Sequence, residues 1–141
     1  MRKCVISLFA LIITMFVLAS CSQSEEQGDK NSDEDGDEVQ YEMITAEQAK
    51  NIMESETGYI ILDVRTDEEF AESRIAGAIL IPYDEIESRA ENELKDKSQL
   101  ILVYCRSGRR SKIAAQELVE LGYTNVKEFG GIIDWSYGTV S

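Results

Sequence analysis

Short apolar runs alternate along the chain with segments of helical period, and this alternation restricts the fold more than any other feature. Compact apolar runs of strand length occupy residues 59–64, 79–81, 100–104 and 126–129. Continuous apolar strands joined by helices and short loops are typical of a largely parallel sheet that is buried on both faces. The sequence therefore predicts one α/β domain over residues 40–141, with a mostly parallel β-sheet flanked by helices.

The segments between the strands carry signals for helices. Thr45–Gln48 has the form of a capping box in front of an apolar stripe. Residues 84–95 place apolar side chains on one helical face, and residues 112–121 do so most clearly, with Gly122 as the closing residue. A short helix carrying Trp135 is expected near the end of the chain.

The N-terminal segment predicts export. Residues 1–20 begin with basic side chains and contain a 15-residue apolar run, which is short for a membrane span of about 20 residues and typical of a signal peptide. The run ends in Leu18-Ala19-Ser20-Cys21, which resembles the lipobox of bacterial lipoproteins. That resemblance implies a palmitate-type lipid on Cys21 and a membrane-anchored lipoprotein on the extracytoplasmic side, at the cell surface or in the periplasm. An ordinary secretory peptide and an uncleaved anchor helix are the alternatives.

Residues 21–39 are predicted to be a disordered acidic tether behind the lipidated cysteine. Residues 22–39 contain eight acidic side chains, one lysine and one apolar side chain. Such a segment buries too little surface to offset the entropy of ordering and is extended by its own charge. Cation capture is the other interpretation, but the spacing of an EF-hand is absent.

The composition excludes several classes of function. A formal charge of −13 and a pI of about 4.4 argue against a nucleic-acid partner. The absence of histidine removes Ser-His-Asp and Cys-His catalysis and imidazole metal sites, and we expect no metal and no cofactor. The three cysteines, Cys4, Cys21 and Cys105, are too few and too scattered for a disulfide framework.

Cys105 lies where a site in an α/β sheet belongs, because it directly follows the strand at residues 100–104. The segment 105–110 can wrap as a cradle with its backbone N–H groups pointing inward, and Gly108 permits the positive φ that such a loop needs. Four basic residues add a cationic field that favours a thiolate and an anionic substrate: Arg106, Arg109, Arg110 and Lys112. The alternative is a buried structural cysteine followed by solvated arginines.

Four sequence signatures, taken in order, resemble the rhodanese-like domain family over most of residues 41–138. They are Asp63-Val64-Arg65 with Glu69-Phe70; Ile75-Ala76-Gly77-Ala78 with Ile81-Pro82; Cys105-Arg106-Ser107-Gly108-Arg109-Arg110-Ser111; and Leu121-Gly122-Tyr123 with Gly130-Gly131 and Trp135. The chain departs from the family at Arg74, where histidine is frequent, and at Thr139, where proline is frequent. Neither departure touches the loop.

The resemblance implies a sulfurtransferase in which Cys105 is the nucleophile and carries a persulfide. It implies substrate contacts from the loop residues Arg106, Ser107, Gly108, Arg109 and Arg110. The donor would be a small anion such as thiosulfate and the acceptor a thiol or cyanide. Arg110 is expected to tie the loop to a carboxylate or to contribute long-range field.

Four further residues are expected to support the site. Asp63 and Arg65 are predicted to form structural hydrogen bonds or an ion pair, with Glu69 as a candidate partner. Trp135 is expected to plug the core, with the substrate mouth as the alternative position.

Two other functions stay open. One is a non-turnover sulfur carrier or a thiol-redox or binding module with a protein thiol partner. The other is a phosphatase or arsenate reductase, which loop length disfavours: those enzymes have Cys-x5-Arg, whereas Cys105 and Arg110 form Cys-x4-Arg.

Overall fold

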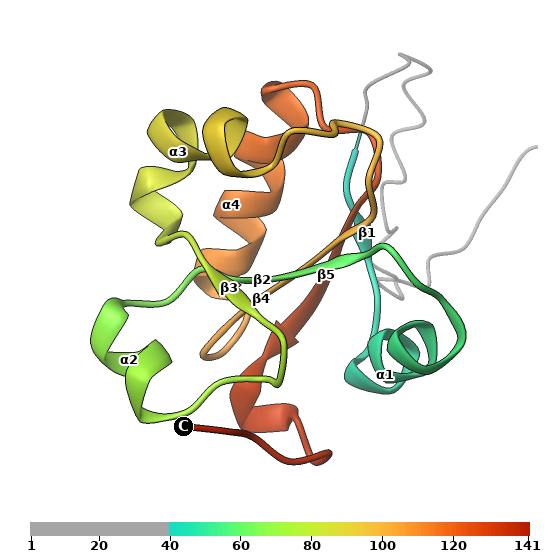
Figure 1. The fold of residues 1–141 in the computed structure, drawn as a ribbon, viewed down its shortest axis with the longest axis vertical. Coiled ribbons are helices and arrows are strands. Elements are labelled where there is room, and N and C mark those ends of the chain that lie inside the picture. The colour runs from blue at the N-terminus through green and yellow to red at the C-terminus, as the bar shows by residue number, and fades with distance from the viewer. Residues whose placement is uncertain (1–39) are drawn as a thin grey trace, which may run out of the picture. The chain divides into compact units, whose positions relative to one another are not determined.

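The computed structural model describes residues 40–141 (Figure 1). The predicted signal peptide at 1–20, the predicted lipid site at Cys21 and the predicted tether at 21–39 lie outside the described residues. Within the described range, no helix has the length and apolar character needed to cross a bilayer.

A five-stranded sheet forms the centre of the described domain, in the order β1-β5-β4-β2-β3 with neighbouring strands parallel. The strands are β1 (Glu42–Met43), β2 (Ile60–Asp63), β3 (Ile79–Leu80), β4 (Ile101–Cys105) and β5 (Val126–Gly131). The helices are α1 (Ala46–Ser55), α2 (Asp67–Glu72), α3 (Ile86–Glu93) and α4 (Arg109–Glu120), with 3₁₀ turns at Tyr83–Glu85 and Ile132–Asp134. The predicted α/β architecture is confirmed.

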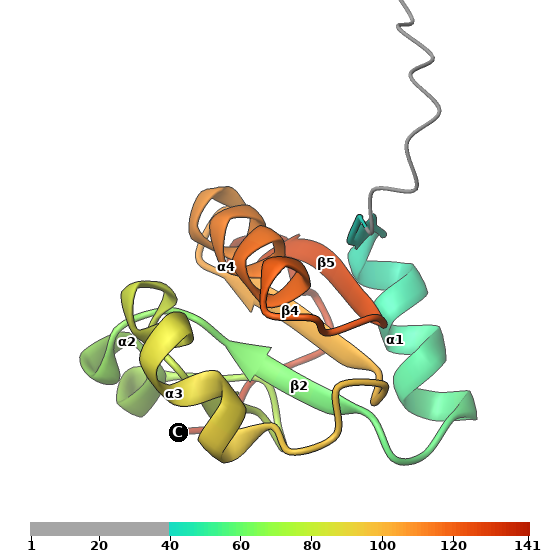
Figure 2. The ribbon, with the colours of Figure 1, turned by 90° about the horizontal axis from the view of Figure 1, so that it is seen from above.

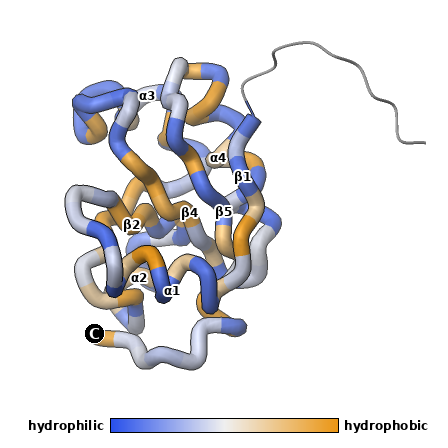
Figure 3. Tube along the Cα trace, turned by 90° about the vertical axis from the view of Figure 1, so that its right-hand side faces the viewer, coloured by the Kyte–Doolittle hydropathy of each residue, from blue (hydrophilic) through white to orange (hydrophobic). Residues whose placement is uncertain are grey.

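The sheet separates two hydrophobic clusters. Figure 2 shows α3 and α4 on one face and α1 on the other. Along β4, Val103 and Cys105 belong to the cluster beneath α3 and α4, whereas Leu102 and Tyr104 belong to the cluster on the α1 side. This alternation follows from the two-residue period of a strand. The hydrophobic stretches of the chain accordingly run through β2 and β4 at the centre of the molecule (Figure 3).

The expected capping box begins α1 as predicted. The Thr45 backbone N–H donates to Gln48 Oε1 at 2.8 Å, and the Gln48 N–H donates to Thr45 Oγ1 at 3.1 Å. A second capping box, between Thr66 and Glu69, begins α2, a helix that the sequence analysis did not predict. The signal was present in the sequence as Thr66-x-x-Glu69, but it precedes only one turn and a half of helix.

Two helices differ from the prediction mainly in where they begin. The segment predicted as a helix over 84–95 begins with the 3₁₀ turn and becomes α-helical only at Ile86. The helix predicted over 112–121 begins three residues earlier, at Arg109. Gly108 explains the earlier start, because its φ of +94° turns the chain directly into the first helical residue.

An ion pair is buried where β2 ends. Asp63 is 0% exposed and Arg65 is 4% exposed. The Arg65 guanidinium donates to Asp63 Oδ2 through Nη2 at 2.6 Å and to Oδ1 through Nε at 2.9 Å. Nη2 also donates to the Ser73 carbonyl at 2.6 Å, so the pair fastens the chain that leaves α2 to the end of β2.

Replacing Asp63 with alanine is expected to lower the free energy of unfolding by about 3 kcal/mol, because it leaves the Arg65 charge buried without its counterion. Urea denaturation followed by circular dichroism measures this. The exposed Asp84 has no hydrogen bond or ion pair within the described residues, and Asp84→Ala should change the same quantity by about 0.5 kcal/mol or less. Equal effects of the two substitutions would contradict the assignment.

Candidate active site

The loop from Cys105 to Gly108 connects the last residue of β4 to the first turn of α4. It packs directly against the backbone of β5. A Cβ atom on Gly131 would lie 2.2 Å from the Arg106 carbonyl oxygen and 2.6 Å from Ser107 Cα, so only glycine fits there. The strand register shifts between Val103 and Cys105, and this shift pairs Cys105 with Gly131. The sheet thus determines where the thiol lies.

The Cys105 sulfur is enclosed by hydrogen-bond donors. Its side chain is 1% exposed, and the Gly108 backbone N–H donates to Sγ at 3.1 Å. Burial alone would raise the pKa of the Cys105 thiol. The hydroxyl and N–H of Ser111, together with the N–H groups of Ser107 and Gly108, favour the thiolate and outweigh that effect. The pKa of Cys105 is therefore below its ordinary value.

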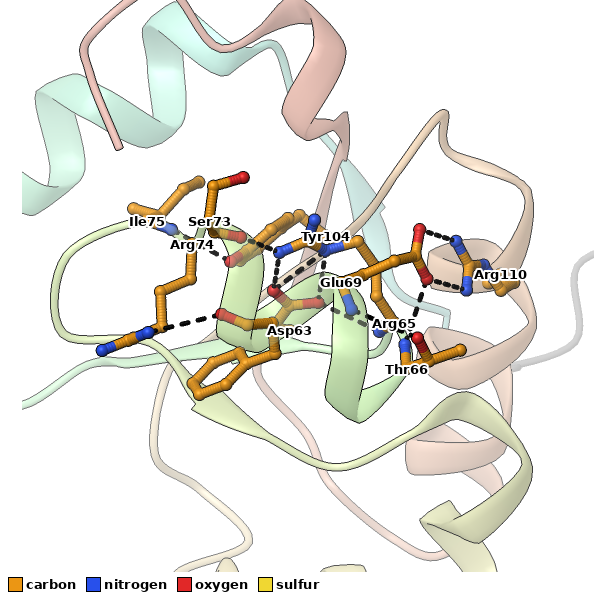
Figure 4. A network of polar contacts seen from close by, with 10 residues as sticks. Asp63, Arg65, Thr66, Glu69, Ser73, Arg74, Ile75, Tyr104 and Arg110 are labelled. Atoms are coloured by element: carbon orange, nitrogen blue, oxygen red, sulfur yellow. Dashed lines mark hydrogen bonds and ion pairs between the residues drawn. The ribbon is translucent and has the colours of Figure 1, made fainter. Parts of the chain in front are cut away.

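The arginines of the loop fall into two groups. Arg110 is bound: its Nη1 and Nη2 donate to the two carboxylate oxygens of Glu69 at 2.7 and 2.9 Å (Figure 4). Hydrogen bonding to Arg110 is the main reason that the pKa of Glu69 falls to about 2. Arg106 and Arg109 are exposed, and within residues 40–141 neither guanidinium has a carboxylate partner. These two side chains are available to an anion.

Asp63, Arg65 and Glu69, which were expected to support the site, lie at the end of the sheet that carries the loop. Their pairing differs from the prediction in one respect. Figure 4 shows Asp63 facing Arg65, as the sequence analysis anticipated. Glu69, expected as a candidate partner of that pair, instead forms its ion pair with Arg110 across 41 residues of chain. The Arg110 guanidinium is free to donate two parallel hydrogen bonds to the Glu69 carboxylate. The Arg65 guanidinium is less suited to this pairing because its donors are already satisfied.

Two aromatic residues lie behind the site. The Tyr104 hydroxyl accepts a hydrogen bond from the Ile75 N–H at 3.1 Å, which fixes the chain that leads into β3. Trp135 is 9% exposed and packs against Phe129 in a tilted arrangement with 5.7 Å between the ring centroids. Its Nε1 donates to the Gly138 carbonyl at 3.0 Å. Trp135 therefore occupies the core.

Two polar residues lie beneath the loop: Ser111, which belongs to the loop signature but was given no role from the sequence, and Glu128, which was not singled out. Ser111 is 0% exposed and Glu128 is 3% exposed, and the Ser111 hydroxyl donates to Glu128 Oε1 at 2.5 Å. The sequence signal for Glu128 is its position two residues after Val126, on the same face of β5, where an apolar side chain is expected. A charged residue on the buried face of a strand is unusual enough to mark a polar site.

A groove of about 240 Å³ opens beside the loop. The residues that line it are Arg65, Glu69, Glu72, Ser73, Arg106, Ile132 and Ile133. The Ile133 N–H donates to the Arg106 carbonyl at 3.3 Å, which holds this rim of the groove against the loop. A larger groove of about 540 Å³ lies along α4 and includes none of the residues from Cys105 to Ser111. Of these two grooves, the smaller one borders the loop, at Arg106.

Comparison with known proteins identifies similar chains. A thiosulfate sulfurtransferase, PspE of Escherichia coli, is 40% identical over 73 residues, which cover 52% of this chain and 70% of PspE. A sulfurtransferase of Allochromatium vinosum is 37% identical over 78 residues, covering 55% of this chain and 71% of the relative.

Solved structures agree with these relatives. A rhodanese with anions from E. coli has a TM-score of 0.56 and 36% identity, and the match covers 59% of this chain and 98% of that one. The rhodanese-like domain of the Alr3790 protein from Anabaena has a TM-score of 0.66 and 29% identity, and the match covers 70% of this chain and 78% of that one. The sequence model of the rhodanese-like domain family matches residues 45–137. The chain therefore belongs to the rhodanese-like domain family, whose named members include sulfurtransferases.

Proposed function

We propose that the protein transfers sulfane sulfur from a small anionic donor to a thiophilic acceptor through a persulfide on Cys105. The observation that carries this proposal is the enclosure of the Cys105 sulfur by N–H and O–H donors of its own loop, which lowers the pKa of the thiol without a general base. The enzyme type is thiosulfate:cyanide sulfurtransferase. The similar E. coli protein that contains anions supports an anionic donor here.

In the first step the Cys105 thiolate attacks the outer sulfur of the donor. With thiosulfate, a new S–S bond forms at Cys105, the S–S bond of thiosulfate breaks, and sulfite leaves with the electron pair of that bond. The negative charge then lies on the outer sulfur of the persulfide. We expect the backbone N–H groups of residues 106–110 to stabilise that sulfur. Those of Ser107 and Gly108 already lower the pKa of the thiol, and the Gly108 N–H donates to Sγ at 3.1 Å.

In the second step the acceptor attacks the outer sulfur and the Cys105 thiolate leaves. Cyanide gives thiocyanate, and a thiolate acceptor gives a persulfide on the acceptor. The donors that lower the pKa of Cys105 also make it a better leaving group, so the same hydrogen bonds assist both halves of the cycle.

The arginines have different roles in this proposal. Arg106 and Arg109 are exposed at the rim and attract the anionic donor. Arg110 is held by Glu69, so it fixes the start of α4 and contributes its charge to the site from a fixed position. This engagement of Arg110, together with the short Cys-x4-Arg loop, disfavours phosphatase and arsenate reductase chemistry.

Incubating the full-length protein with thiosulfate is expected to add the mass of one sulfur atom to the tryptic peptide of residues 98–106, which contains Cys105 as its only cysteine. Cyanide should then remove that sulfur and release thiocyanate. Mass spectrometry of the peptide and a colour assay for thiocyanate measure the two steps. Cys105→Ser should abolish both, and Cys4→Ser should leave both unchanged.

The same experiment separates turnover from carriage. A persulfide that forms but resists cyanide and small thiols indicates the alternative function, a sulfur carrier that needs a protein thiol partner. A peptide that stays unlabelled in a folded protein contradicts sulfur transfer from thiosulfate.

The rate of Cys105 alkylation by iodoacetamide should rise with pH around a midpoint below that of the same peptide in the urea-unfolded chain. Because the folded-state pKa is lowered, the ionised thiol stabilises the fold above the unfolded pKa, and that stabilisation is lost as pH falls through the folded pKa. Peptide-resolved mass spectrometry at a series of pH values measures both midpoints. A folded midpoint at or above the unfolded one would refute the activation of Cys105.

We also propose that Cys21 carries lipid and anchors the protein to the outer side of a membrane, on the basis of the signal-peptide pattern and lipobox. In a bacterium that processes lipoproteins, the protein should incorporate labelled palmitate and sediment with membranes. Cys21→Ser should lose the label, and Cys105→Ser should retain it. Palmitate labelling that survives in Cys21→Ser would exclude this site.

A further inference from the structure

Glu128 is a buried acid that the proposed reaction does not use. Within residues 40–141, buried Asp63 has the Arg65 guanidinium as its counterion, but no lysine or arginine lies within ion-pair distance of Glu128. The neighbouring Lys127 contacts Glu42 on β1 instead. A carboxylate taken out of water without a cation needs strong hydrogen-bond donors.

Two donors reach one oxygen of the Glu128 carboxylate, and they come from the two elements that flank the active-site loop. The Ser111 hydroxyl donates to Oε1 at 2.5 Å from the first turn of α4. The Gly130 N–H donates to the same oxygen at 2.9 Å from the β5 strand. Glu128 therefore links α4, the helix that follows the loop, to β5, the strand against which the loop packs.

The Ser111 hydroxyl has one proton and several acceptors within reach. Glu128 Oε1 is the nearest at 2.5 Å, while the carbonyl oxygens of Gly108 and Gly130 lie at 3.1 and 3.4 Å. The hydroxyl also lies beside the sulfur site, because Gly108, whose carbonyl oxygen is 3.1 Å from Ser111 Oγ, is the residue whose N–H donates to Cys105 Sγ at 3.1 Å. Ser111 is accordingly among the groups that lower the pKa of the Cys105 thiol. A hydroxyl donates one hydrogen bond at a time, so donation to Glu128 and donation to the sulfur exclude each other.

We propose that Glu128 is a positioning residue that controls the Cys105 sulfur through Ser111, by competing with the sulfur for the single hydroxyl proton. When the sulfur is a thiolate, Ser111 divides its donation between two anions. When the negative charge moves to the outer sulfur of a persulfide, the Ser111 hydroxyl again donates its hydrogen bond to Glu128. The role in sulfur transfer rests on the proposed function, whereas the competition itself is a property of the thiol and needs no sulfur donor.

Other charged groups near the thiol are fixed by their own partners. Arg110 on α4 is paired with Glu69 on α2, and Asp63 on β2 is paired with Arg65. Substitutions at Glu128 leave these ion pairs in place. If such a substitution changes the ionisation of Cys105, the change comes either from the Ser111 hydroxyl or from the loss of the Glu128 charge.

The test measures the pH midpoint of Cys105 alkylation by iodoacetamide in the full-length protein, on the tryptic peptide of residues 98–106. In Glu128→Gln, a neutral amide oxygen replaces a charged acceptor, so Ser111 donates more to the sulfur. The midpoint should fall by about half a pH unit, which is about threefold more thiolate below the midpoint. Ser111→Ala should raise the midpoint.

The double variant Glu128→Gln/Ser111→Ala shows whether Glu128 acts on the sulfur through Ser111. Its midpoint should equal that of Ser111→Ala alone, because the hydroxyl through which Glu128 acts is gone. A shift on Glu128→Gln that persists in full without Ser111 would overturn the proposal in favour of a direct charge effect. An unchanged or raised midpoint in Glu128→Gln would overturn it as well.

Two further variants test the role of the Glu128 carboxylate: a shorter acid at the same position and a matched control on the surface. Glu128→Asp keeps the charge but withdraws the carboxylate by one methylene, which weakens its hydrogen bond from Ser111, so the midpoint should move in the same direction as in Glu128→Gln. Glu47→Gln makes the same chemical change on the exposed face of α1 and should leave the midpoint unchanged. These outcomes do not depend on whether thiosulfate is the donor.

Discussion

The close contact between β5 and the active-site loop is the constraint on which the thiol environment depends. The donors around the Cys105 sulfur come from residues 107–111, and their directions are set by the loop's path from β4 to α4. That path runs against Gly131, where a side chain would collide with the Arg106 backbone. The register shift that places Cys105 beside Gly131 is therefore part of the site, because it brings the loop to a position on β5 that has no side chain.

Neutral hydrogen-bond donors, and not charged side chains, lower the pKa of Cys105: the Ser111 hydroxyl first, followed by the backbone N–H groups of Ser111, Ser107 and Gly108. The amide groups of a rigid loop need no reorganisation when the sulfur ionises, and they are close enough to escape screening by salt. The arginines serve other purposes: Arg110 fastens α4 to Glu69, while Arg106 and Arg109 stay exposed at the rim. A domain within a chain of net charge −13 can thus present a locally cationic site.

The sequence predicted the elements whose signals are local and long. The apolar runs of β2, β4 and β5 and the capping box at Thr45 were identified because periodicity and capping leave a direct trace. The short α2 and the two-residue β1 were missed, since tertiary packing stabilises them more than their own residues do. The Arg110–Glu69 pairing and the Ser111–Glu128 bond join residues 41 and 17 positions apart, and only the folded sheet brings them together.

The lack of histidine has a consequence for how reactive the thiol can be. Without a general base, the thiolate must form by stabilisation alone, yet a thiolate that is stabilised too strongly loses nucleophilicity. Burial of Cys105 acts against its hydrogen-bond donors and so limits this stabilisation. A second acceptor for the Ser111 proton limits it further, since it weakens one donor without removing it. In the proposed sulfur transfer, the buried acid thus preserves the nucleophilicity of Cys105, although its negative charge disfavours a neighbouring anion.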